Sequence, residues 1–164
     1  MVNSRAPETN HAAAGSAWYW LAALLALVGL SDALYLTYQH LTGAHVQCGI
    51  VQGCAQVLGS KYAYVGQYPL AGLGALAYFA AFSLAVLAAS GYRRAALLFL
   101  PLVCTMFLTT LYLLYLQAFV IEHFCQYCLL SAAVTTCLTL LAFILRRTRA
   151  EARVSARASL KADT

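Results

Sequence analysis

Four long apolar runs, separated by polar stretches, form the main pattern of the chain. They cover Ala17–Tyr38, Pro69–Ala89, Ala95–Ile121 and Cys125–Leu145. About 20 helical residues cross a hydrocarbon core of about 30 Å, so each run is long enough to span a membrane. None of the runs alternates apolar and polar residues with a period of two, which favours helices over transmembrane strands. The pattern predicts an all-α integral membrane protein with a four-transmembrane-helix bundle.

The composition excludes a water-soluble fold. Of the 164 residues, 63% are hydrophobic and 9% are charged, whereas about a quarter of the residues of a typical soluble domain are charged. The mean hydropathy is +0.75, and folding at this length leaves about 30% of the unfolded chain's surface exposed. A soluble globular domain, a disordered chain and a disulfide-rich secreted mini-protein are therefore excluded. We expect one membrane domain over residues 17–145.

Basic residues indicate how the predicted bundle is oriented. Of the ten Lys and Arg, Lys61 lies in the long loop between the first two runs, about residues 39–68. The others lie at the opposite end: Arg5, Arg93, Arg94, Arg146, Arg147, Arg149, Arg153, Arg157 and Lys161. The positive-inside rule then predicts cytoplasmic termini and an outer loop. We expect the tails, residues 1–16 and 146–164, to be disordered or to form a short surface helix. Nucleic-acid binding explains the basic tail poorly, because no aromatic residues interleave its charges.

Two cysteine pairs are expected at the outer face. Cys48 and Cys54 lie in the long loop, and Cys125 and Cys128 form a Cys-x-x-Cys motif at the start of the last predicted helix. The dipole and the free N–H groups of a helix N-terminus favour the thiolate of the first cysteine and so lower its pKa. The second cysteine, one turn later, is placed to resolve a mixed disulfide. The combination predicts thiol–disulfide exchange.

Two pairs that alternate between dithiol and disulfide would form an electron relay. A water-soluble partner can reach the loop pair, which would pass electrons to the membrane-embedded pair. The apolar runs hold no paired histidines for haem, and the chain has no nucleotide-binding fingerprint. A quinone in the bilayer is therefore the expected electron acceptor. Cys104 and Cys137 fall in the middle of apolar runs and are expected to be packing residues.

The outer cysteines allow other interpretations at this point. Cys48 and Cys54 could form a structural disulfide in a non-catalytic tetraspan scaffold. All four outer cysteines, or three of them with His123, could instead bind zinc, although the five-residue spacer between Cys48 and Cys54 is less typical of such sites. A compartment that oxidises thiols also disfavours a stable thiolate site. The redox state of these cysteines, with and without quinone, distinguishes the three interpretations.

Two polar side chains near the outer ends of the predicted helices are further candidates. Asp32 lies inside the first run, about two turns before Tyr38. An ionisable residue in a span is a functional candidate, and an interhelical hydrogen bond is an equal alternative. Tyr68 lies at the end of the outer loop, where its hydroxyl could reach a quinone carbonyl or belong to an interfacial belt of tyrosines.

Several short segments together resemble one known family. They are Leu34-Tyr-Leu-Thr37, Cys48, the segment from Cys54 to Ser60, Tyr68-Pro-Leu-Ala-Gly72 and Cys125-Gln-Tyr-Cys128. From about Ser31 to Ala132, the chain resembles the bacterial vitamin K epoxide reductase family. The most specific feature is the order of a loop pair, a nearby serine and a Cys-x-x-Cys that opens the last helix. The DsbB type of quinone-linked thiol oxidase carries its Cys-x-x-Cys in the first outer loop and matches less well.

The resemblance implies a four-helix bundle around a quinone pocket that the long loop covers. Cys125 and Cys128 would be the catalytic pair, with Cys128 next to the quinone. Cys54 would exchange with Cys125, Cys48 would take electrons from a thioredoxin-fold partner, and Ser60 would lie close to the reacting sulfur atoms. The alternative for Ser60 is a helix cap or a loop hydrogen bond.

On this resemblance we expect an enzyme, a quinone-dependent thiol–disulfide oxidoreductase of the bacterial inner membrane. It would reoxidise a separate DsbA-like protein outside the cytoplasm and pass two electrons to menaquinone or ubiquinone. The sequence given has 19 residues after Leu145, so we expect no fused thioredoxin domain. Leu130, Ser131 and Ala132 stand where the animal enzymes have Thr-Tyr-Ala, so epoxide reduction and the animal type of anticoagulant contact are not implied.

Overall fold

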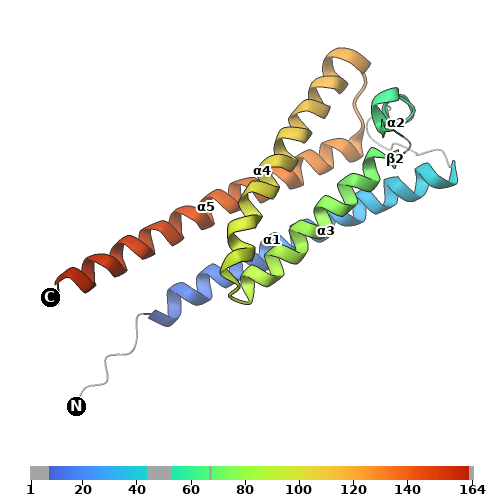
Figure 1. Cartoon of the computed structure of the whole chain (residues 1–164). Helices are drawn as coiled ribbons and strands as arrows, with labels where there is room; N and C mark the ends of the chain where they lie inside the picture. Colours follow the sequence, from blue (N-terminus) through green and yellow to red (C-terminus); the bar gives the residue numbers. More distant parts are fainter. Residues whose placement is uncertain (1–7, 44–52, 67, 163–164) are drawn as a thin grey trace.

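Helices make up most of the molecule, as the apolar runs predict. The computed structural model describes residues 8–43, 53–66 and 68–162. Four helices are long and apolar enough to cross a membrane (Figure 1), which confirms the expected four-helix membrane protein. These helices are α1 (Glu8–Thr42), α3 (Leu70–Ala89), α4 (Arg93–Leu116) and α5 (Gln126–Ala162).

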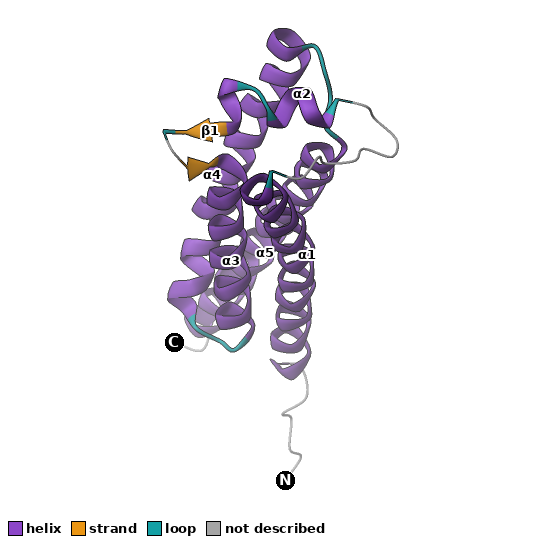
Figure 2. Ribbon diagram, turned by 90° about the vertical axis from the view of Figure 1, so that its right-hand side faces the viewer, coloured by secondary structure: helices purple, strands orange, loops and turns teal. Residues whose placement is uncertain are grey.

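The four long helices pack in a ring (Figure 2), in which α1 contacts α3 and α5, and α4 contacts α3 and α5. Alanines on α1 and α3, among them Ala22, Ala26, Ala81 and Ala85, are fully buried in the core. Small residues let two helix backbones approach closely, which strengthens van der Waals packing where lipid offers no hydrophobic driving force. The alanine-rich runs therefore account for the close contact between α1 and α3.

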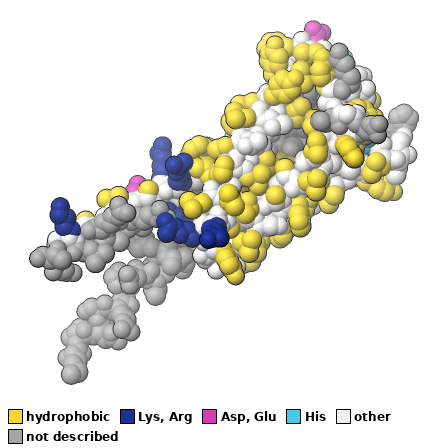
Figure 3. Space-filling view, viewed as in Figure 1, with side chains coloured by type: hydrophobic (Ala, Val, Ile, Leu, Met, Phe, Trp, Pro, Cys, Tyr) yellow, Lys and Arg dark blue, Asp and Glu magenta, His cyan; other side chains and the backbone are white. Residues whose placement is uncertain are grey.

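Large apolar side chains cover the outside of the ring. Leu24, Leu76, Leu98, Leu108 and Leu140 are all more than half exposed. Figure 3 shows apolar side chains along the middle of the molecule, and Lys and Arg gathered at the end where the chain termini lie. An apolar surface of this extent is stable only against lipid or another apolar partner. The exposed side chains thus belong to the membrane-facing surface.

Helix α5 does not end with its apolar run near Leu145. It continues through the basic segment to Ala162, where disorder or a short surface helix was expected. Residues 146–162 are rich in Ala and Arg, which have high helix propensity. They also extend a helix that is already nucleated, so each added residue gains a hydrogen bond without a new nucleation cost. Helix α1 likewise begins at Glu8, inside the expected N-terminal tail.

A short folded segment, which we call the cap, lies over the end of the ring opposite the termini (Figure 1). It contains α2 (Cys54–Leu58), a 3₁₀ turn (Lys61–Ala63) and an antiparallel pairing of β1 (Tyr64–Val65) with β2 (Tyr68–Pro69). Pro69 ends β2 and stands directly before α3. Since proline lacks an N–H group, it leaves no backbone donor unpaired at the start of a helix. The cap is thus joined directly to the bundle.

A buried tyrosine connects three of the long helices. The Tyr78 hydroxyl of α3 lies 2.8 Å from both Ser131 Oγ and Thr135 Oγ1 of α5, and it donates to the Ser131 carbonyl at 3.0 Å. The Tyr78 ring is 2% exposed and lies against Gly29 of α1. A Cβ atom at Gly29 would overlap this ring. The absence of a side chain at Gly29 therefore decides whether Tyr78 can keep its hydrogen bonds.

We expect Gly29→Ala to destabilise the bundle, because the added methyl group displaces a ring that hydrogen bonds hold in place. Overpacking of this kind costs about 1–3 kcal/mol. The measurement is thermal unfolding of the purified protein in detergent. Gly72→Ala is the matched control, since its Cβ would meet Pro69 Cγ and Thr37 Cγ2 at ordinary contact distances of 3.7 and 3.8 Å. Equal stability of the two variants would contradict this account.

Candidate active site

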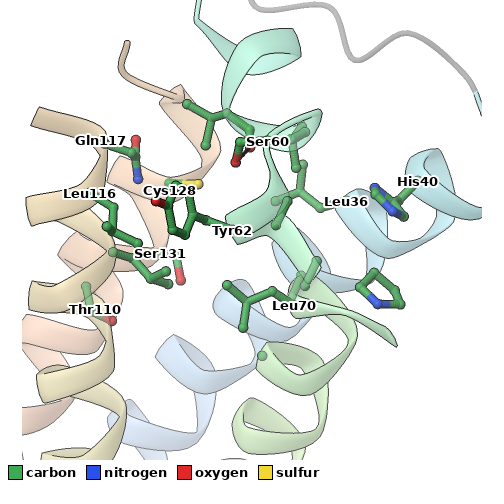
Figure 4. Close-up of a pocket in the computed structure, with 18 of the residues that line it drawn as sticks. Leu36, His40, Ser60, Tyr62, Leu70, Thr110, Leu116, Gln117, Cys128 and Ser131 are labelled. Carbon is green, nitrogen blue, oxygen red and sulfur yellow. Dashed lines mark hydrogen bonds between the residues drawn. The ribbon is translucent and has the colours of Figure 1, made fainter. Parts of the chain in front are cut away.

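A cavity lies beneath the cap, and residues from all four long helices line it. It holds about 140 Å³, several times the roughly 10–15 Å³ that a single water needs. Its walls are mainly apolar, with Leu36, Leu70 and Leu113 among the lining residues. The polar and titratable side chains that line it come from several elements: Asp32, His40, Ser60, Tyr62, Tyr78, Thr110, Gln117, Cys128 and Ser131. Figure 4 shows several of these side chains around the space. An apolar cavity with few converging polar groups is typical of a small-molecule site.

Two cysteines from distant parts of the chain meet beside this cavity. The Sγ atoms of Cys54 and Cys125 are 3.5 Å apart, and the two residues are 1% and 0% exposed. Cys125 is a free thiol, whereas Cys54 is part of a disulfide. A thiol in van der Waals contact with a disulfide sulfur is the starting geometry for thiol–disulfide exchange. Cys48, the other expected member of the loop pair, lies outside the described residues.

The approach of the two sulfur atoms depends on close backbone packing at Gly53. Gly53 is buried directly before Cys54 and lies against the backbone of Phe124, the residue directly before Cys125. A Cβ atom at Gly53 would meet Phe124 N at 2.9 Å and would overlap Phe124 O. Because backbone atoms cannot rotate away as a side-chain tip can, only glycine permits this contact. No pattern in the sequence singles out Gly53.

Hydrogen bonds stabilise the thiolate of Cys125. They lower its pKa from the ordinary value to about 7, with the Cys128 thiol as the largest cause and the backbone N–H groups of Cys128 and Tyr127 adding to it, while burial opposes them. These N–H groups belong to the first turn of α5, where donors have no partner within the helix. The Cys-x-x-Cys motif therefore activates its first cysteine, as predicted for a helix N-terminus.

Gln117 holds the backbone in front of this motif. It opens a π-helical turn (Gln117–Ile121) at the end of α4 and is 2% exposed. Its Oε1 accepts a hydrogen bond of 3.0 Å from the backbone N–H of Cys125. The sequence carries a signal for this role, since Gln117 is a polar residue within an apolar run.

The structure separates the predicted tyrosine from the cavity. Tyr68 is 73% exposed in β2 and is not among the lining residues, so it does not face this cavity. Tyr62 and Tyr78 line it instead. The segment after Cys-x-x-Cys lacks a tyrosine of its own, but the Tyr78 hydroxyl contacts Ser131 in that segment. Because Tyr78 belongs to another helix, its spacing along the chain did not reveal this contact.

Ser60 makes the loop hydrogen bond that was its alternative, since its hydroxyl donates to the Val57 carbonyl at 2.7 Å. It also lines the cavity, and its position close to the reacting sulfur atoms stays a prediction. Cys104 and Cys137 are free thiols that do not line the cavity. Within the described ranges, no group of three or more His, Cys, Asp or Glu could hold a metal ion.

Comparison with known proteins agrees with the resemblance seen in the motifs. The model of the vitamin K epoxide reductase family matches residues 20–143, which is most of the chain. The chain belongs to the vitamin K epoxide reductase family. No curated protein matches it closely enough to count as a relative. Membership in this family makes the protein a membrane oxidoreductase whose chemistry concerns thiols, disulfides and quinones.

We expect Gly53→Ala to slow the exchange between Cys54 and Cys125, because the added Cβ pushes α2 away from Phe124. The measurement is the rate at which a Cys54–Cys125 disulfide forms in a Cys128→Ser background, followed by non-reducing mass mapping. Gln56→Ala is the control, since Gln56 is exposed on the same short helix. If Gly53→Ala exchanges as fast as the control, the close approach is not needed for exchange.

Proposed function

We propose that this protein makes disulfides for proteins outside the cytoplasm of a bacterium. It would reoxidise a separate, DsbA-like thioredoxin-fold partner and transfer the two electrons to a membrane quinone, menaquinone or ubiquinone. The observation that carries this proposal is the 3.5 Å contact between Cys54 and Cys125, next to a cavity that Cys128 lines. One sulfur pair thus connects the outer loop to a small-molecule site within the membrane domain.

The exchange steps balance along this path. A partner dithiol reduces the disulfide of Cys48 and Cys54, and the Cys54 thiolate then attacks Cys125 in a Cys125–Cys128 disulfide and releases the Cys128 thiolate. Cys48 next attacks Cys54 as a thiolate, re-forms the loop disulfide and releases Cys125. The proton that Cys48 gives up is balanced by the proton that Cys128 takes up. Thiolates of lower pKa leave faster, so the lowered pKa of Cys125 favours this last step. The arrangement seen, with Cys54 in a disulfide and Cys125 and Cys128 as thiols, corresponds to the state after it.

The side chains that line the cavity are chemically suited to a quinone ring. Leu36, Leu70 and Leu113 supply apolar walls, and Tyr62 and Gln117 supply groups able to donate hydrogen bonds to carbonyl oxygens. A bound quinone supplies a two-electron acceptor there. Cys128 gives up its electrons beside that acceptor as it re-forms a disulfide with Cys125. Gln117 keeps Cys125 in place during this step.

The proposed orientation has cytoplasmic termini and an outward-facing cap. The Lys and Arg visible in Figure 3 gather at the termini, as the positive-inside rule requires of a cytoplasmic end. A disulfide-forming cap belongs in an oxidising compartment. The bacterial inner membrane satisfies both requirements.

A scaffold with a purely structural loop disulfide is the main alternative. A structural disulfide does not require a free thiol in contact with one of its sulfur atoms. Here a buried thiol of lowered pKa lies 3.5 Å from the disulfide-bonded Cys54. This contact favours exchange over a fixed bond.

We expect Cys128→Ser to abolish quinone reduction, since Cys125 then lacks the sulfur with which it re-forms a disulfide. The measurement is anaerobic mixing of the purified protein with a reduced thioredoxin-fold substrate and a short-chain quinone, followed by quinone absorbance. Cys137→Ala is the control, because Cys137 does not line the cavity. Full turnover by Cys128→Ser would show that this pair is not the electron donor.

The pH dependence of Cys125 provides an independent check. Because its pKa is lowered to about 7, alkylation of Cys125 should rise with pH around 7 and level off above it, rather than rise around 8.5 as for an ordinary thiol. Cys128→Ala removes the hydrogen bond and should move the midpoint upward, whereas Cys128→Ser retains a donor and should move it less. Peptide mass spectrometry at a series of pH values measures the rates. A midpoint near 8.5 in every variant contradicts the assignment.

A further inference from the structure

One ionisable side chain at the cavity has no role in the exchange steps. Asp32 lies on α1 inside a membrane-spanning segment, is 8% exposed and lines the cavity. None of the described residues donates a hydrogen bond to its carboxylate or forms an ion pair with it. An interhelical hydrogen bond, the alternative considered from the sequence, is therefore not made within these ranges. An unpaired carboxyl group in a membrane span costs free energy and usually marks a pathway for protons, ions or substrate.

Asp32 acts electrostatically on thiols and phenols. Its charge acts on Cys125 and Cys128, and on Tyr78 of α3 and Tyr127 of α5. The other titratable groups lining the cavity are His40 of α1 and Tyr62 of the cap, and no Lys or Arg is among the lining residues. Asp32 thus has no cationic partner at the cavity, and both reacting thiols lie within its electrostatic reach.

Proton movement is the chemistry that this position fits. Oxidation of two thiols to a disulfide releases two electrons and two protons, and reduction of a quinone to a quinol takes up the same numbers. In a cavity with apolar walls, charge separation between these two events is costly. A carboxyl group that lines the same cavity as Cys128 can give a proton to one centre and take one from the other, so that no net charge accumulates.

We propose that Asp32 is the proton-transfer residue of this site. In this inference, which rests on the proposed quinone-linked function, the Asp32 carboxyl protonates one quinone oxygen and then takes the proton that leaves the Cys128 thiol as the Cys125–Cys128 disulfide forms. The second proton does not pass through Asp32. Cys125 has already released its proton to water outside the cavity, and the other quinone oxygen takes up an equivalent proton. Two thiols become one disulfide, one quinone becomes one quinol, and Asp32 ends as it began.

Tyr78 is less suited to this role. Its hydroxyl already donates to the Ser131 carbonyl and lies 2.8 Å from two further hydroxyl groups. A proton that leaves it would break the network that joins α3 to α5. Asp32 makes no such hydrogen bond within the part of the chain that the structure describes.

The test compares Asp32→Asn, which keeps the shape but carries no transferable acid proton, with Asp32→Glu, which keeps the carboxyl group. Ser31→Ala is the matched control, because Ser31 is exposed on the adjacent position and its hydroxyl only bonds the Leu27 carbonyl of its own helix. Each pre-reduced protein is mixed anaerobically with short-chain ubiquinone over a range of pH. Exchange between Cys54 and Cys125 is measured separately by non-reducing mass mapping.

We expect Asp32→Asn to slow quinone reduction by about 10²-fold or more, with the exchange between Cys54 and Cys125 unchanged. The limb of the pH profile in which the rate falls as the pH rises should disappear in Asp32→Asn and persist in Asp32→Glu and Ser31→Ala. A purely structural role for Asp32 would instead change the rates without removing this limb. That result, or an Asn variant as fast as the control, overturns the inference and leaves the proposed function intact.

A second measurement uses the unmodified protein, in case Asp32→Asn does not fold. Dicyclohexylcarbodiimide, which reacts with protonated carboxyl groups in apolar surroundings, should label Asp32 and block quinone reduction while exchange at Cys54 continues. Undiminished quinone reduction by protein labelled at Asp32 overturns the inference alone. If the unlabelled protein reduces no quinone, the proposed function falls and this inference falls with it.

Discussion

The contact between the sulfur atoms of Cys54 and Cys125 is the constraint on which the site depends. Exchange needs sulfur atoms within contact distance, and here 3.5 Å separates them. This distance requires the backbone before each cysteine to pack closely, at Gly53 and Phe124. The cap can therefore deliver Cys54 to the bundle only in a narrow range of positions. The β1–β2 pairing and the junction at Pro69, which join the cap to α3, serve this placement.

The position of Cys125 in this contact depends on the connection between α4 and α5. A π-helical turn changes the direction of the chain, and Glu122 completes the reversal with a left-handed backbone at φ 56°. π-helical turns are rare and often occur at functional sites. Gln117 opens this turn, and its side chain accepts a hydrogen bond from the Cys125 N–H across the reversal of the chain.

Hydropathy and local motifs predicted the fold and the lowered pKa of Cys125, because both depend on residues close together in the chain. The four spans follow from length and apolarity alone, and the lowered pKa of Cys125 follows from the Cys128 thiol three residues later and from the N–H groups at the start of α5. Contacts between helices were out of reach. Tyr68 seemed suited to the cavity by its position beside the loop, yet the strand pairing turns it outward, and Tyr62 and Tyr78 line the cavity instead. Nothing in the spacing of Tyr78 indicates that Gly29 makes room for it.

The membrane explains why the polar groups of this protein gather at one place. Along the spans, polar side chains mostly satisfy themselves within their own helix, as the hydroxyls of Ser83 and Thr105 do by bonding the carbonyl four residues earlier. At the cavity, Asp32, Gln117 and Ser131 come from three helices and face a common space. Lipid cannot solvate such groups, so they are tolerated only where protein encloses them or water and ligand reach them. In the proposed function, a soluble partner reaches one sulfur pair at this end of the bundle while a lipid-soluble acceptor reaches the other. Both requirements would place the cysteines at the boundary between water and lipid, where the polar side chains also lie.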